Sequence, residues 1–200
     1  MRVRKAVLPV AGFGTRVLPA TKAIPKEMLP VVDRPAIQYV VDEALEAGIE
    51  HIVFVTGRNK GSIEDYFDIP YELEVALEAK GKKAILEQVK QTTLPAGSAS
   101  FVRQQSPLGL GHAVWCARDI VGNEPFAVLL GDTIIDPPAD EPRPGLQQLI
   151  DAYDKTHASV VAVHHVPRQW VTRYGIVDGQ PEADDANLYR LNRLIEKPSV

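Results

Sequence analysis

Short, continuous apolar runs alternate with amphipathic stretches along most of this chain. The runs are Ala6–Val10, Ile52–Thr56, Phe101–Arg103, Phe126–Leu130 and Ser159–Val163. An apolar run without polar alternation is typical of a strand that is buried on both faces, as in a parallel sheet. Parallel strands need a crossover between them, and the amphipathic stretches are long enough to supply it. We therefore expect an α/β fold with a mixed, mostly parallel sheet and helices on both faces.

The amphipathic stretches between the runs differ in composition. Three of them are expected to be helices that cover the sheet: Pro35–Ala47, Gly111–Ile120 and Leu146–His157. A fourth, Tyr71–Gln91, is highly charged, and we expect a helix inserted over the sheet, with Gly81 as its weak point. Asp136–Pro144 is rich in proline and Asp178–Asn187 is polar, so both are expected to be loops.

The size and charge of the chain exclude several classes of protein. Its 200 residues are enough for a substantial core, and we expect a single domain over residues 1–200. A net charge of −4 without a basic tract argues against nucleic acid as a partner. No apolar run approaches the ~20 residues of a membrane span, and we find no signal-peptide pattern. The single cysteine, Cys116, suits a reducing compartment, so we expect a cytoplasmic protein without a membrane partner.

The segment A-G-F-G-T-R, Ala11–Arg16, follows the first predicted strand directly. Ligands bind outside the carboxyl ends of the strands in open α/β sheets, so this loop lies where a ligand would bind. Gly12 and Gly14 let backbone N–H groups approach phosphate oxygens, and cations such as Arg16 and Lys26 add positive charge nearby. The spacing fits neither a Walker loop nor the G-x-G-x-x-G turn of a dinucleotide fold. The glycine pair alone fits an ordinary strand-exit turn equally well.

The longer string A-G-F-G-T-R-V-L-P-A-T-K-A-I-P-K-E-M-L-P, residues Ala11–Pro30, is more specific. It resembles the signature of the sugar-1-phosphate nucleotidylyltransferases, in the form typical of the bacterial UTP–glucose-1-phosphate uridylyltransferases. The thymidylyl- and adenylyltransferase relatives share the glycine–Thr–Arg part, but typically not A-I-P-K-E-M-L-P. The resemblance implies catalytic roles for Arg16, at the leaving phosphates, and Lys26, at the α-phosphate. It also implies nucleotide contacts from Ala11, Gly12, Gly14, Thr15 and Glu27.

A second motif, F-V-R-Q-Q-S-P-L-G-L-G-H-A, occupies Phe101–Ala113. The resemblance implies that Gln104 and Gly109 bind the nucleotide there, at the edge of the uracil. One glutamine amide can serve both the donor and the acceptor position of uracil, and Gly109 lets the backbone come close to the base. A lone glutamine is more often a solvated surface residue, so this role rests on the surrounding motif.

Two further motifs supply carboxylates and a lysine. Asp132 follows the run L-L-G, and the resemblance makes it a Mg²⁺ ligand, although an aspartate at this position is about as often a cap or turn residue. Many relatives have a second aspartate where this chain has Thr133. The segments Y-G-I-V and I-E-K-P match the sugar-phosphate-binding segments of the family, with Gly175, Glu196 and Lys197 as the implied residues.

The resemblance implies a Mg²⁺-dependent enzyme with a Rossmann-like fold of the nucleotide-diphospho-sugar transferase type. Its reaction would convert UTP and glucose 1-phosphate to UDP-glucose and pyrophosphate, by direct in-line attack of the sugar phosphate on the α-phosphorus. At full length it would be a homo-oligomer. Because family members continue well past the I-E-K-P segment and draw a second metal carboxylate from there, we expect a C-terminally incomplete domain with weak or no activity of its own.

Other functions stay open on the sequence alone. One is a non-catalytic protein that binds UTP or UDP-glucose, which the second metal carboxylate would distinguish. Another is a sugar-1-phosphate transferase that uses dTTP or ATP. A dehydrogenase is a more distant alternative, because the loop lacks the third glycine of a dinucleotide fold.

Overall fold

The computed structural model of the chain describes residues 1–137, 142–183 and 185–198. The chain divides into two compact units, Met1–Ile150 and Asp151–Val200. The single domain expected over residues 1–200 stays a prediction. Within the described residues, no helix is both long and apolar enough to cross a membrane.

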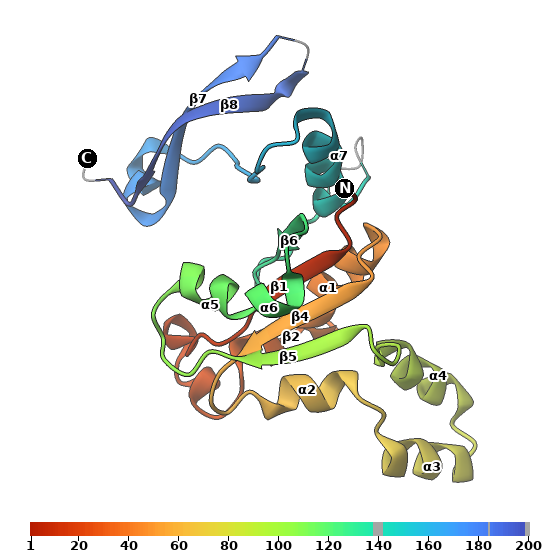
Figure 1. Ribbon diagram of the computed structural model, residues 1–200. Coiled ribbons are helices and arrows are strands. Elements are labelled where there is room, and N and C mark those ends of the chain that lie inside the picture. The colour runs from red at the N-terminus through yellow and green to blue at the C-terminus, as the bar shows by residue number, and fades with distance from the viewer. Residues whose placement is uncertain (138–141, 184, 199–200) are drawn as a thin grey trace. The chain divides into compact units, whose positions relative to one another are not determined.

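The first unit is built on a sheet of four parallel strands in the order β5-β4-β1-β6 (Figure 1). The strands are β1 Lys5–Pro9, β4 His51–Thr56, β5 Ala99–Arg103 and β6 Phe126–Val128. Each corresponds to one of the predicted apolar runs, with ends that differ by at most two residues. The continuous apolar pattern therefore identifies these strands correctly, and its physical basis is clearest in β1 and β4, whose central residues are buried on both faces.

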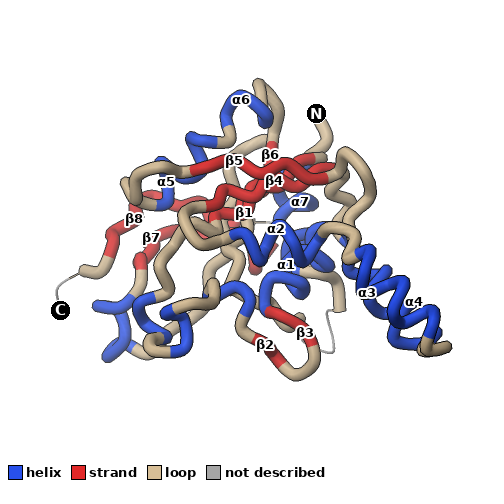
Figure 2. The backbone as a smooth tube through the Cα atoms, turned by 90° about the horizontal axis from the view of Figure 1, so that it is seen from below, coloured by secondary structure: helices blue, strands red, loops and turns tan. Residues whose placement is uncertain are grey.

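Helices lie on both faces of this sheet, with α5 and α6 on one side and α1 and α2 on the other (Figure 2). The helices are α1 Ala36–Glu46, α2 Gly61–Phe67, α3 Tyr71–Ala79, α4 Lys83–Thr92, α5 Leu110–Cys116, α6 Arg118–Val121 and α7 Gly145–Thr156. Val7, Val53 and Val55 pack against small side chains of α5 and α6. Successive strand residues point to opposite faces, and on the other face Phe54 stacks on Phe67 of α2 with 5.2 Å between ring centroids.

Shorter elements connect these layers. They are the 3-10 helices Thr15–Val17, Ala20–Lys22 and Lys26–Met28, and the two-stranded hairpin of β2 Pro30–Val31 and β3 Arg34–Pro35. All of them lie between β1 and α1 in the sequence. The motif Ala11–Pro30 therefore folds as a series of tight turns rather than as one helix.

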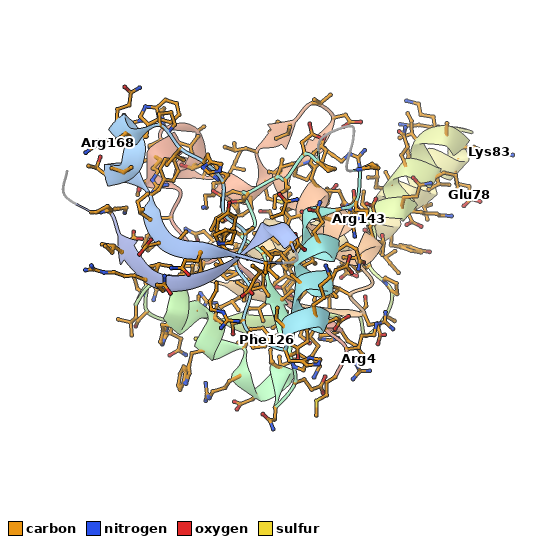
Figure 3. All side chains as sticks on the ribbon, turned by 90° about the horizontal axis from the view of Figure 1, so that it is seen from above. Arg4, Glu78, Lys83, Phe126, Arg143 and Arg168 are labelled. Atoms are coloured by element: carbon orange, nitrogen blue, oxygen red, sulfur yellow. The ribbon has the colours of Figure 1, made fainter. Side chains whose placement is uncertain are left out.

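The charged stretch predicted as one helix over Tyr71–Gln91 is two helices, α3 and α4. The chain turns at Gly81, which has a φ of +63° that side-chain-bearing residues rarely adopt. The expected weak point is thus a complete break. The helical hairpin extends away from the sheet in Figure 1, and Figure 3 shows Glu78 and Lys83 on it, pointing outward.

The second unit contains an antiparallel hairpin of β7 Gly175–Glu182 and β8 Asp185–Glu196. The prediction of a loop over Asp178–Asn187 is therefore wrong. The polar composition of this segment gave no indication of strands. The two strands are stabilised by pairing with each other, with Glu182 opposite Asp185. The unit also contains a 3-10 helix at Arg168–Arg173.

Two other predictions concern segments without helix or strand. The prediction of a buried strand at Ser159–Val163 is wrong, since within the described residues it forms no ladder with another strand, and Val161 is 52% exposed. An apolar run becomes a strand only where a neighbour accepts its backbone hydrogen bonds. The predicted loop Asp136–Pro144 includes residues 138–141, which lie outside the described residues, and its described part has no regular structure.

Candidate functional site

The loops that follow the four parallel strands meet at one edge of the sheet, where the strands have their carboxyl ends. The predicted site residues of the first unit belong to these loops or to the turns that follow them: Ala11–Arg16 after β1, Gln104 and Gly109 after β5, and Asp132 after β6. β6 is the direct neighbour of β1, and β5 lies two strands away on the other side, about 10 Å. A ligand across this edge would therefore meet Gln104 at one end and Asp132 at the other.

The β1 loop presents unpaired backbone donors. Within the described residues, no protein acceptor takes the backbone N–H groups of Ala11–Gly14. Gly14 has a φ of +65°, and a Cβ there would lie 3.1 Å from the Cβ of Lys26. Thr21 fixes the turn from inside, because its hydroxyl donates to the Gly14 carbonyl at 2.8 Å. Consecutive free N–H groups held in this way form a concave site for an anion.

Two predicted cations lie at this loop in different settings. Arg16 is exposed in the 3-10 helix Thr15–Val17, and it pairs with no carboxylate in residues 1–137, 142–183 and 185–198. Lys26 is more enclosed, with its side chain 25% exposed. Its Cε lies 3.9 Å from the position that a Cβ on Gly12 would take, so the end of its stem lies beside the loop.

The structure brings Lys26 together with Asp132, 106 residues away in the sequence. Lys26 Nζ donates to Asp132 Oδ2 at 2.6 Å, and the Asp132 side chain is 42% exposed. The ammonium group thus neutralises the carboxylate and leaves it accessible from solvent.

Asp132 has the chemistry of a Mg²⁺ ligand. Mg²⁺ is commonly held by one or two carboxylates together with substrate phosphates and water, and the lysine ammonium already occupies a cation position beside this carboxylate. No cluster of three or more His, Cys, Asp and Glu side chains gathers elsewhere in the described part of the chain to form a complete metal site. Asp132 therefore fits the role of one Mg²⁺ ligand, and the remaining ligands would have to come from outside the described residues.

The residue before Asp132, Gly131, is fixed by lack of space. A Cβ at Gly131 would lie 2.7 Å from Val10 Cγ1, 3.1 Å from Glu27 Cγ and 3.2 Å from Ile37 Cδ1. Only glycine lets the β6 loop lie this close to β1 and α1.

Replacing Gly131 by alanine is expected to lower the free energy of unfolding by about 1–3 kcal/mol, because a methyl group is forced into a filled space. The measurement is urea unfolding followed by circular dichroism. Gly61→Ala is the matched control, since nothing lies within 4 Å of a Cβ at that helical position. Equal stability losses in the two variants would contradict this account.

Glu27, the residue after Lys26, forms a buried ion pair that the sequence did not predict. Lys60 Nζ donates to Glu27 Oε2 at 2.7 Å, and the two side chains are 6% and 0% exposed. The other carboxylate oxygen, Glu27 Oε1, has no partner in the described residues. Lys60 follows β4 at the same edge as the other site residues. This position after a predicted strand is the feature of the sequence that could have identified Lys60 as a residue near the site. The nucleotide contact expected from Glu27 stays a prediction, and its visible role is to join the β1 and β4 connections.

Gln104 is oriented by its neighbours. Its amide Nε2 donates to the Gly109 carbonyl at 3.1 Å and lies 3.0 Å from Nδ1 of His112. The amide nitrogen therefore faces two protein atoms, and Oε1 is the amide atom left for a ligand. The contact of Gln104 with a base stays a prediction.

The second unit brings its three predicted residues together by itself. Gly175 is paired with Glu196 across the β7–β8 hairpin, and a Cβ on Gly175 would lie 3.2 Å from Glu196 Oε2. Lys197 Nζ lies 3.4 Å from Glu196 Oε1, and both side chains are exposed. Segments about twenty residues apart thus form one exposed group with a carboxylate and an ammonium.

Comparisons with known proteins all find similarity to nucleotidyl transferases. The family model described as Nucleotidyl transferase matches residues 5–200. A UTP–glucose-1-phosphate uridylyltransferase from Bacillus subtilis is 53% identical over 197 residues, which are 98% of this chain and 65% of that protein. A UTP-bound UGPase from Acinetobacter baumannii has a TM-score of 0.90 and is 48% identical. The aligned region is 98% of this chain and 68% of that protein's chain. A UDP-glucose pyrophosphorylase complexed with UDP-glucose has a TM-score of 0.81 and is 42% identical. The aligned region is 98% of this chain and 69% of that protein's chain. The chain spans about two thirds of the length of each.

Proposed function

Because this chain belongs to the nucleotidyl transferase family, we propose that it carries the substrate-binding residues of a uridylyltransferase that makes UDP-glucose and pyrophosphate from UTP and glucose 1-phosphate. The family resemblance of the motifs is confirmed by the match over residues 5–200. The choice of UTP and glucose 1-phosphate is supported by the names of the relatives at about half identity.

One observation carries the proposal, the contact of Lys26 with Asp132 beside a loop of free N–H groups. A nucleotidyl transfer needs donors for a departing pyrophosphate, a cation at the reacting phosphorus, and a carboxylate that can hold a metal ion. The first unit has groups at one sheet edge that suit each of these roles, which supports the proposal.

The roles follow from where each group lies. The N–H groups of Ala11–Gly14 and the Arg16 guanidinium would hold the β- and γ-phosphates of UTP, since Arg16 can bind two oxygens at once. Lys26 would turn from Asp132 to the α-phosphate, where its ammonium stabilises the charge of the transition state. The sugar phosphate is already ionised at neutral pH, so no side chain needs to act as a nucleophile.

Asp132 would hold Mg²⁺ once Lys26 has moved to the phosphate. When bound, Mg²⁺ neutralises phosphate charge and holds the phosphate groups in position. Glu196 and Lys197 would bind the sugar and its phosphate, since a carboxylate accepts from hydroxyl groups and an ammonium pairs with phosphate.

The test is UTP binding by calorimetry, together with pyrophosphate release from UTP, dTTP or ATP in the presence of glucose 1-phosphate and Mg²⁺. We expect UTP to bind this chain, and the full-length enzyme to release pyrophosphate fastest with UTP. Binding without release from the full-length enzyme would favour a non-catalytic nucleotide-binding protein. Preference for dTTP or ATP would favour the related transferases, and the absence of UTP binding would exclude the proposal.

A further inference from the structure

His112 of α5 lies against Gln104 without belonging to the groups assigned above. The Gly109 carbonyl can only accept a hydrogen bond, so the amide atom that faces it at 3.1 Å has to be the nitrogen of Gln104. The second hydrogen of this nitrogen then points to Nδ1 of His112 at 3.0 Å. The histidine nitrogen is therefore the acceptor in this contact.

The thiol of Cys116 is a second neighbour of the ring. Its Sγ, one helical turn along α5, lies 3.9 Å from Nδ1 of His112. A thiol can donate or accept weakly, so this contact fits either role of Nδ1, and the acceptor role rests on the contact with the Gln104 amide.

We propose that His112 is a positioning residue for base selection, because it holds the Gln104 amide with Oε1 free to accept a hydrogen bond from a nucleobase. This inference rests on the proposed nucleotide site. If the amide turned over, Oε1 would face two acceptors, the Gly109 carbonyl and His112 Nδ1, and both contacts would be lost. Within the described residues, no protein donor occupies Oε1.

The fixed acceptor selects among pyrimidines. Uracil has an N–H donor at ring position 3, which matches Oε1. Cytosine has a lone pair at the same position, which Oε1 repels. An amide free to turn would present its N–H group to that lone pair and so reduce the difference between the two bases.

Two substitutions of similar shape separate the acceptor from the packing. His112→Leu puts a methyl group, and His112→Asn an oxygen acceptor, at the same number of bonds from Cα as Nδ1. Calorimetry with UTP and with CTP gives the ratio of the two affinities for the unaltered protein and each variant. We expect the ratio to fall about 3–10-fold in His112→Leu, the effect of one neutral hydrogen bond, and to stay near its original value in His112→Asn. Urea unfolding shows whether each variant folds.

The outcomes separate this inference from the proposed function. Leucine is the better helix former, so a merely structural role would leave His112→Leu the less affected variant, and that result would overturn the inference. An unchanged ratio in both variants would overturn it as well, while leaving UTP binding, and hence the proposed function, intact. Failure of the unaltered protein to bind UTP would instead overturn the proposed function, and this inference with it.

Discussion

Replacing Lys26 by alanine is expected to lower turnover of the full-length enzyme about 10²–10³-fold, the usual effect of removing one group that stabilises transition-state charge. The side chain is only 25% exposed and lies between the free N–H groups of the β1 loop and Asp132. No other lysine or arginine in the described residues pairs with Asp132. Pyrophosphate release measures the loss, and urea unfolding is expected to show an intact fold.

Asp132→Asn is expected to reduce turnover to a similar degree, because it removes the negative charge that pairs with Lys26 and that, in the proposed function, would hold Mg²⁺. The matched control is Lys83→Ala, which removes a lysine from the α3–α4 hairpin that extends away from the sheet (Figure 3). Turnover of the control should stay near that of the unaltered enzyme. If either site variant keeps near-normal turnover, the proposed function is wrong.

Glu27→Gln is expected to lower the free energy of unfolding by about 3–5 kcal/mol, because it leaves Lys60 charged, buried and without its counter-ion. Urea unfolding followed by circular dichroism measures the loss. Glu50→Gln is the matched control, since Glu50 pairs with Arg2 and Arg4 on the surface. An exposed pair contributes about 0–1 kcal/mol, so the control should change little.

A double variant tests the cause of this loss. Replacing both partners, Glu27→Leu with Lys60→Met, removes the unpaired charge and should recover much of the stability that Glu27→Gln loses. A double variant as unstable as Glu27→Gln would show that shape, rather than charge, holds this site together.

The fold of the first unit could be predicted from local patterns. Apolar runs without alternation identify β1, β4, β5 and β6, and the two central strands, β1 and β4, are buried on both faces and so have no polar side. Parallel strands then bring the loops that follow them to one edge, which is why sequence motifs gave the positions of Arg16, Gln104 and Asp132 on the fold.

The same patterns failed where order comes from a partner. The polar stretch Asp178–Asn187 lies largely in β7 and β8, which pair with each other, whereas the apolar run Ser159–Val163 forms no ladder with another strand in the described residues. Periodicity reports which face of a segment is buried, and it does not report whether a neighbouring strand is present.

By itself, then, the sequence determined the parallel sheet, the edge at which ligand binding is expected and the family of the chain. Only the tertiary structure decided which side chains meet there: Lys26 with Asp132, Glu27 with Lys60, and Gln104 with Gly109 and His112. Two of these contacts, Lys26 with Asp132 and Glu27 with Lys60, join residues from different strand connections. The distances within these two pairs depend on how the strands are ordered and on how closely Gly131 lets the loops approach. A residue's own neighbours in the sequence carry no information about such contacts, because the packed sheet alone brings them within hydrogen-bond distance.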